Sequence, residues 1–117
     1  SMDVLPPVLE AHILRVQGVL RALREGRSFP GYVLGENAEE YCHLGRWLRG
    51  EGDLMFWQLP QFQDLLARHK RLHLISRTAK SLLDDGKRVE ALHQGDLLEK
   101  ENDQLVEAIR LTLADVL

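Results

Sequence analysis

A single cysteine and five histidines are the residues of this 117-residue chain whose chemistry stands out. His69 and His73 stand four residues apart, a spacing that places both imidazoles on one face of a helix and within reach of one ion. Cys42 is the only thiol, and His12 lies well upstream of it. One sulfur and three imidazole nitrogens form a closed set of four ligands that suits Zn²⁺. His12, Cys42, His69 and His73 are therefore the candidate metal ligands.

The apolar pattern predicts that the three histidines of this set point into the protein. His12 falls on the apolar stripe of one predicted helix, and His69 and His73 fall on that of another. Burying an imidazole without a partner costs about 1–3 kcal/mol, and one shared metal ion would satisfy all three. A simpler interpretation fits the same residues: a core cysteine that packs as a small apolar side chain, and histidines that bond to their neighbours. Residue types and spacing leave both interpretations open.

Four segments have the apolar periodicity of helices, and none alternates as a strand does. Proline in a first turn marks the start of the first, and glycines and an Asp-Gly turn separate the others. The expected helices cover about residues 6–25, 37–50, 60–84 and 87–116. Amphipathic helices joined by loops pack as an antiparallel four-helix bundle, so we predict an all-α fold with a short second helix that carries the Cys ligand.

The short second helix contains the candidate ligand Cys42. Asn37 is its predicted N-cap, with Glu40 as capping-box partner. Cys42 then lies in the second turn, and Gly45 would let a neighbouring helix or the other ligands come close. Trp47 is expected to cover the site. After this helix, an aromatic-rich connector that includes residues 55–57 is expected to lie across the end of the bundle.

Two further local expectations concern the fourth helix and the remaining histidines. The weakly apolar middle of the fourth helix, around Gly95 and Asp96, permits a kink or a break there. His43 and His93 do not share the apolar stripes, so we expect both to be exposed.

Composition restricts the class of protein. The chain has 44% hydrophobic and 28% charged residues, which fits one soluble domain over residues 1–117. A net charge of −3 gives no basic surface for nucleic acid, and no apolar run approaches the roughly 20 residues of a membrane span. One cysteine and no secretory segment place the expected location in the cytoplasm. Ser1 before Met2 resembles a cloning scar.

Other metal-dependent classes fit the pattern less well. Iron carriers of the hemerythrin or ferritin type need carboxylates on the same helical stripes, and a thiolate ligand suits zinc better. A zinc hydrolase needs an open coordination position, which four protein ligands do not leave. We therefore expect no enzyme. A helical protein-interaction module in which the zinc is purely structural stays open as the alternative to a sensor.

The run Cys42-x-Leu-Gly45-x-Trp47-Leu-x-Gly50, preceded by His12 and followed by His69-x-x-x-His73, resembles the chemoreceptor zinc-binding (CZB) domain of bacteria. The similarity extends from His12 through the third predicted helix. It departs from the family where a Trp often stands three residues after the first His, since this chain has Arg15 there.

The resemblance implies a function as well as a fold. Family members bind Zn²⁺ with three His and one Cys, which correspond here to His12, Cys42, His69 and His73. They are commonly homodimers of a four-helix bundle, and they stand alone or are joined to cytoplasmic chemoreceptors or diguanylate cyclases. They report zinc or oxidant to chemotaxis or cyclic-di-GMP signalling. The expected partners are therefore a second copy and such an output module, in cis or in trans, with no nucleic acid and no membrane.

Overall fold

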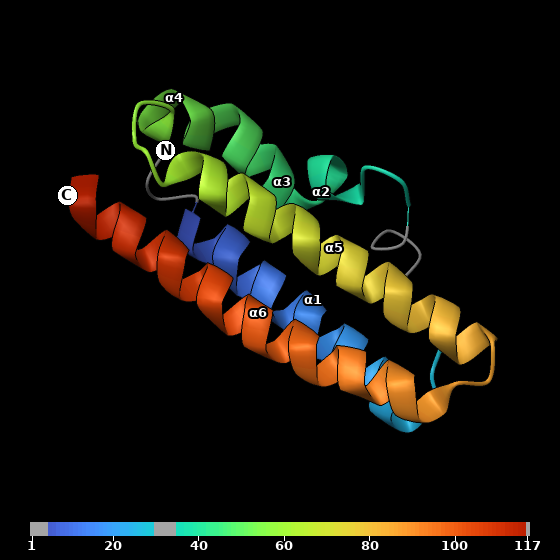
Figure 1. Cartoon of the computed structure of the whole chain (residues 1–117). Coiled ribbons are helices and arrows are strands. Elements are labelled where there is room, and N and C mark those ends of the chain that lie inside the picture. The colour runs from blue at the N-terminus through green and yellow to red at the C-terminus, as the bar shows by residue number, and fades with distance from the viewer. Residues whose placement is uncertain (1–4, 30–34, 117) are drawn as a thin grey trace.

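The computed structural model describes residues 5–29 and 35–116, which are mostly helical (Figure 1). In chain order the elements are α1 (Leu5–Glu25), α2 (Ala38–Tyr41), α3 (His43–Trp47), the π-helix η2 (Leu48–Gly52), α4 (Asp53–Phe56), α5 (Phe62–Asp84) and α6 (Arg88–Val116). No strand occurs within those two ranges, and the predicted all-α class is confirmed.

A hairpin of two long helices, α5 and α6, forms the largest part of the structure. The turn between them contains Gly86, whose φ of +75° lies in the left-handed region that favours glycine, as the Asp85-Gly86 signal predicts. The break that the sequence permits in the fourth helix does not occur, because α6 runs without interruption. Gly95 instead marks close packing, since a Cβ there would lie 3.2 Å from Cδ1 of Leu23 on α1.

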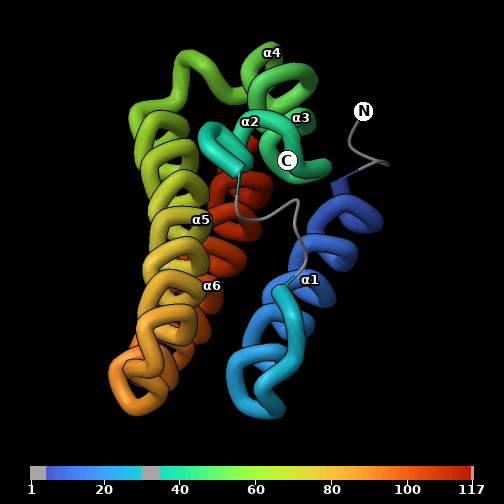
Figure 2. The backbone as a smooth tube through the Cα atoms, turned by 90° about the vertical axis from the view of Figure 1, so that its right-hand side faces the viewer, coloured from blue at the N-terminus to red at the C-terminus, as the bar shows by residue number. Residues whose placement is uncertain are grey.

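The first long helix, α1, packs along α6 and against α3. It begins at Leu5 with two prolines in its first turn, where a missing N–H costs nothing, and it ends before Gly26, whose φ is +70°. Figure 2 shows α5 and α6 side by side, with α1 beside them. The buried apolar side chains come from all three long helices and from α3, η2 and α4, and include Leu9, Val19, Leu23, Leu44, Leu48, Phe56, Phe62, Leu65, Leu98, Leu105 and Ile109.

The chain between α1 and α5 differs most from the prediction. The expected single second helix is divided: α2 stops at Tyr41, Cys42 is extended with φ −71° and ψ 161°, and α3 starts at the next residue. Asn37 has a positive φ of 60° and makes no side-chain cap, so the predicted capping box is wrong. We call residues 38–56, from α2 through α4, the divided segment.

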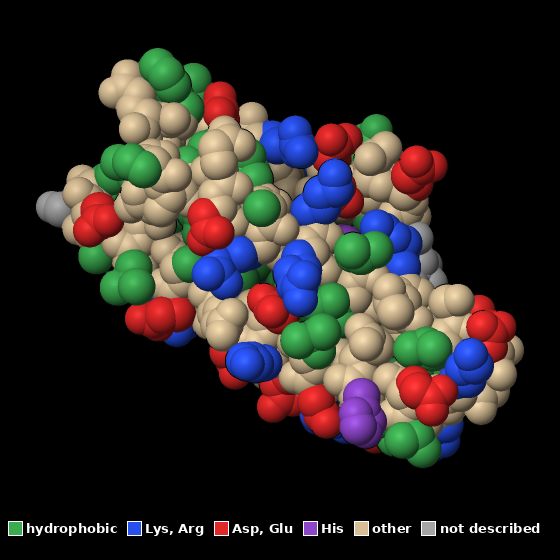
Figure 3. Space-filling view, viewed as in Figure 1, with side chains coloured by type: hydrophobic (Ala, Val, Ile, Leu, Met, Phe, Trp, Pro, Cys, Tyr) green, Lys and Arg blue, Asp and Glu red, His purple; other side chains and the backbone are tan. Residues whose placement is uncertain are grey.

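The far end of the divided segment carries exposed apolar side chains. The predicted connector is in part the short helix α4, on which Leu54 is 80% exposed, and Trp57 just after it is 62% exposed. Figure 3 shows hydrophobic side chains gathered over this end of the molecule.

The molecule is elongated, with principal extents of 46 × 21 × 21 Å. The first residues of α1 and the last residues of α6 lie at the same end, close to α4 (Figure 1). None of the helices in the described residues has both the length and the apolar character that a membrane crossing requires.

Candidate metal centre

Three of the four predicted ligands meet at one point between the divided segment and α5. The Nε2 atom of His69 lies 3.2 Å from Sγ of Cys42 and 3.2 Å from Nε2 of His73. One ligand atom from each residue lies within 4.8 Å of the other two. The two imidazoles come from successive turns of α5, as the four-residue spacing predicts, and both are buried.

The divided segment is shaped to bring the sulfur to this point. The extended backbone at Cys42 directs the chain from α2 into α3, and Sγ accepts a hydrogen bond from the backbone N–H of Gly45 at 3.3 Å. The sulfur thus caps the first turn of α3. Cys42 is therefore the N-cap of a helix rather than a residue in its second turn.

Gly45 is required by the space around it. A Cβ on this residue would lie 1.6 Å from the carbonyl oxygen of Glu39 and 3.2 Å from Cε1 of His69. Any side chain here would push α2 away from α3 and α3 away from α5. This confirms that the glycine of the motif permits close approach, and it identifies α2 and the His69 ring as the groups that come close.

The spacing of these atoms fits a metal ion better than it fits hydrogen bonds alone. Nε2 of His69 faces both the sulfur and the second imidazole nitrogen, and one ring nitrogen carries at most one proton to share between them. Tetrahedral zinc, with Zn–N of about 2.0 Å and Zn–S of about 2.3 Å, separates its ligand atoms by about 3.3–3.6 Å. The measured distances of 3.2 Å are close to that range.

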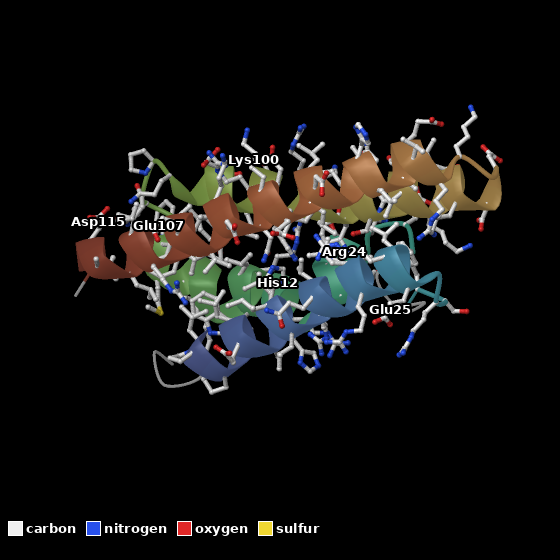
Figure 4. All side chains as sticks on the ribbon, turned by 90° about the horizontal axis from the view of Figure 1, so that it is seen from below. His12, Arg24, Glu25, Lys100, Glu107 and Asp115 are labelled. Atoms are coloured by element: carbon white, nitrogen blue, oxygen red, sulfur yellow. The ribbon has the colours of Figure 1, made fainter. Side chains whose placement is uncertain are left out.

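His12 lies next to the cluster but not within it. Its ring centroid is 5.9 Å from that of His69, and it is 6% exposed. A small cavity of about 30 Å³ is lined by His12, Cys42 and His73 among other residues, so the fourth predicted ligand lines the same cavity as two residues of the cluster. Figure 4 shows His12 on the side of α1 that faces α6. That His12 binds the metal stays a prediction.

Burial prepares the histidines for metal binding. It lowers the pKa of His12 to about 4 and that of His69 to about 2, mainly because the charged imidazolium loses its hydration. Both rings are therefore neutral at physiological pH, the form in which imidazole binds metals. Burial also raises the pKa of the Cys42 thiol, so this sulfur carries a proton until a cation replaces it.

The side chains around the cluster follow the predictions in part. His43 and His93 are exposed, as expected. Arg15, which stands where the family often has Trp, directs a guanidinium nitrogen to Nδ1 of His43 at 3.3 Å. The Trp47 ring packs on Phe56, with 5.8 Å between centroids, and on Gly52, and its role as a cover of the metal stays a prediction.

One residue of the site was missed by the sequence reasoning. Asn102 on α6 is 6% exposed, and its Oδ1 lies 2.7 Å from Nε2 of His12. The signal was present, because Asn102 occupies a position of the apolar stripe between Leu98 and Leu105. A polar residue at a core position of a helix needs a partner, and here that partner is a candidate ligand.

Comparison with known proteins agrees with the geometry. A family model described as the chemoreceptor zinc-binding domain matches residues 12–80, more than half of the chain. Searches of curated proteins and of solved structures find no match. The family is a zinc-binding sensory family and not a catalytic one, and its metal, Zn²⁺, is the ion that the Cys, His and His cluster suits. This chain belongs to the chemoreceptor zinc-binding domain family.

Proposed function

We propose that this chain is a sensory domain in which His12, Cys42, His69 and His73 bind one Zn²⁺ and in which the state of that site controls the divided segment. The observation that carries the proposal is the convergence of three ligand atoms within 4.8 Å. Two of the three belong to buried histidines, and the third belongs to the segment with the shortest helices.

Each ligand has a separate part in the proposed mechanism. His69 and His73 form a fixed base on α5, since both rings are buried and lie on successive turns of a long helix. Cys42 joins the divided segment to that base, and His12 joins α1 to it. Bound zinc supplies a positive charge that keeps the Cys42 sulfur in its thiolate form.

The input acts on Cys42. When the sulfur is no longer held, α2 and α3 lose the contact that joins them to α5, and a helix of four residues such as α2 is too short to be stable alone. Loss of zinc produces this release. Attack of the Cys42 thiolate on a peroxide-type oxidant produces it as well: one oxygen atom is transferred to the sulfur to give a sulfenic acid, the oxidant is reduced to water or an alcohol, and the oxidised sulfur is a weaker metal ligand.

The output belongs to a partner module. In this proposal the divided segment takes the place of the second helix in an antiparallel four-helix bundle, and the bundle forms a homodimer in the cytoplasm. A shift of the divided segment is passed to a chemoreceptor or a diguanylate cyclase, in cis or in trans. Membership in a chemoreceptor zinc-binding family supports this choice of output.

Metal content tests the proposal most directly. Purified wild type is expected to contain about one zinc per chain by elemental analysis, and Cys42→Ala much less. His93→Ala is the matched control, because it removes an exposed histidine of α6 and should leave the zinc unchanged. Wild type without zinc, even after zinc is supplied, would refute the proposal.

A structural role for zinc is the second candidate, since a buried site of four protein ligands is the type that holds structural zinc. Exchange of the bound metal separates the two. A sensor should give up its zinc to a chelator while the long helices stay folded, whereas a structural zinc should leave only when the whole domain unfolds.

A further inference from the structure

The His12 ring has a buried hydrogen-bond partner on α6. The Nε2 atom of His12 lies 2.7 Å from Oδ1 of Asn102, a short separation between two side chains that are each 6% exposed. The amide oxygen accepts, so Nε2 carries the proton and donates it. This hydrogen bond joins α1 to α6 across 90 residues of sequence.

A neutral imidazole has one protonated nitrogen and one free lone pair. Since Nε2 donates to Asn102, Nδ1 is left with the lone pair that can bind a metal. Histidines that bind metals usually donate their other N–H to a carbonyl or a carboxylate, which fixes both the tautomer and the orientation of the ring. The contact between His12 and Asn102 has the form of such a support.

We propose that Asn102 is a positioning residue of the zinc site, which holds His12 in the tautomer that binds zinc through Nδ1. The proposal rests on the proposed function, because it assumes that His12 is a ligand. It extends the site to α6, beyond the matched residues 12–80. A change at the metal would then reach α6 as well as the divided segment.

The hydrogen bond between His12 and Asn102 is buried. An asparagine amide and an imidazole would each lose hydration in the core without a partner, so the two groups satisfy one another. Asn102 also lines an open groove between α1 and α6, together with Ile13, Gln17 and Arg21.

The tautomer of His12 is the decisive measurement. In the zinc-loaded wild type, long-range ¹H–¹⁵N correlation of the histidine rings should show Nε2 of His12 protonated and Nδ1 bound to metal. Metal bound to Nε2 of His12 would overturn the proposal, because the hydrogen bond to Asn102 could not then exist. This measurement does not depend on any variant.

Two variants and a control test the effect on affinity. Asn102→Leu removes the acceptor at similar size and should weaken zinc binding by about 10- to 100-fold, measured by competition with a chelator. Asn102→Asp keeps an acceptor and should bind zinc within about threefold of wild type or more tightly, since a carboxylate makes the imidazole a stronger donor to metal. Unchanged affinity in Asn102→Leu would overturn the proposal.

The control is Thr112→Val on the same helix. Thr112 is 2% exposed, and its hydroxyl donates to the carbonyl of Ala108. Its side chain is therefore buried and polar, as that of Asn102 is, but it makes this hydrogen bond within α6. It should leave zinc affinity unchanged. If Thr112→Val and Asn102→Leu weaken zinc binding equally, Asn102 acts only through the stability of α6 and the proposal fails.

Failure of this inference can be told from failure of the proposed function. If wild type binds zinc and Cys42→Ala does not, the sensor proposal stands whatever Asn102 does. If His12→Ala binds zinc as wild type does, His12 is no ligand, and both the four-ligand site and the role of Asn102 fall while the cluster of Cys42, His69 and His73 remains.

Discussion

The hairpin of α5 and α6 and the divided segment are opposite in construction. The hairpin has helices of 23 and 29 residues, a glycine turn suited to its backbone, and a continuous apolar contact. The divided segment has the four-residue helix α2, a break at Cys42, and then a helical run in which α3, the π-helix η2 and α4 follow one another directly. Both regions expose some large apolar side chains: Leu54 in the divided segment, and Leu74, Val89 and Leu111 in the hairpin.

This contrast indicates where a signal can arise. Long helices with apolar contacts along their length are stable by packing, and short ones depend on specific contacts at their ends. Cys42 is such a contact, since its sulfur both caps α3 and lies against His69 on α5. In the proposed function the hairpin is the fixed part, and the divided segment is the part whose order depends on the site.

Removal of zinc should produce the largest difference between the two regions. Amide hydrogen exchange in residues 38–56 should accelerate by about 100-fold or more, while the middle of α5 and α6 changes by less than about tenfold, because the hairpin keeps its apolar packing. Comparison of exchange with and without a chelator checks this. An equal loss of protection in both regions would favour the structural role of zinc.

A methyl group at Gly45 should disrupt the divided segment and spare the hairpin. Gly45→Ala places a Cβ 1.6 Å from the carbonyl oxygen of Glu39, so α2 and α3 must separate. We expect a loss of about 3 kcal/mol in the free energy of unfolding of the zinc-bound protein, at the upper end for overpacking, together with weaker zinc binding.

Gly18→Ala is the matched control for that change. Gly18 lies within α1 and a Cβ there meets nothing within 4 Å. The substitution should stabilise the protein by about 0.5–1 kcal/mol through helix propensity. Urea unfolding of both variants measures the pair, and equal effects would show that the space at Gly45 is not limiting.

The metal-free protein should lose stability as the pH falls below 6.5. The folded-state pKa values of His12 and His69 are lowered to about 4 and about 2, so between these values and 6.5 the unfolded chain binds more protons than the folded chain. The contribution of these two histidines to stability is therefore fully present at pH values above the unfolded-state pKa of 6.5. It is lost as the pH falls from 6.5 toward the folded-state values. The two groups together should cost about 2 kcal/mol between pH 7 and pH 5.5.

Urea unfolding of the chelator-treated protein at the two pH values measures this loss. His12→Gln should remove about half of the dependence and His93→Gln none. A pH dependence that persists in full without His12 would mean that its ring is solvated in the metal-free protein.

Removal of a surface ion pair should have the smallest effect on the free energy of unfolding, in the hairpin as in the divided segment. Arg49 lies 3.3 Å from Glu40 within the divided segment, and Arg24 lies 2.8 Å from Glu99 between α1 and α6, with all four side chains substantially exposed. Arg49→Ala and Arg24→Ala should each change the free energy of unfolding by less than about 0.5 kcal/mol. A larger effect of Arg49→Ala alone, in thermal unfolding, would reveal that the divided segment depends on charge as well as on Cys42.

The sequence predicts the long helices and the cluster for the same physical reason. Apolar residues at steps of three and four mark the core faces, and His69 and His73 share that spacing, so periodicity places them on one face of α5. The turn at Gly86 and the end of α1 at Gly26 follow from the freedom of glycine at positive φ.

The divided segment could not be predicted in this way. Its shape depends on tertiary contacts, such as the close approach of the Glu39 carbonyl to Gly45 and of the Cys42 sulfur to His69, and local propensity contains no information on these. Asn37 shows the limit clearly: its type suits an N-cap, yet its positive φ gives it a turn conformation instead. Asn102 was visible as a polar residue on an apolar stripe, but its partner lies 90 residues away.

The hydrogen bond from Gly45 to Cys42 gives this protein an internal reporter. One backbone amide proton points at the sulfur that the signal is proposed to change. A thiolate, a protonated thiol and an oxidised sulfur attract that proton to different degrees, so its NMR chemical shift distinguishes these states without a dye or a mutation. The chemical state of Cys42 can thus be followed at a glycine, on the same molecule and in the same sample in which the helices are observed.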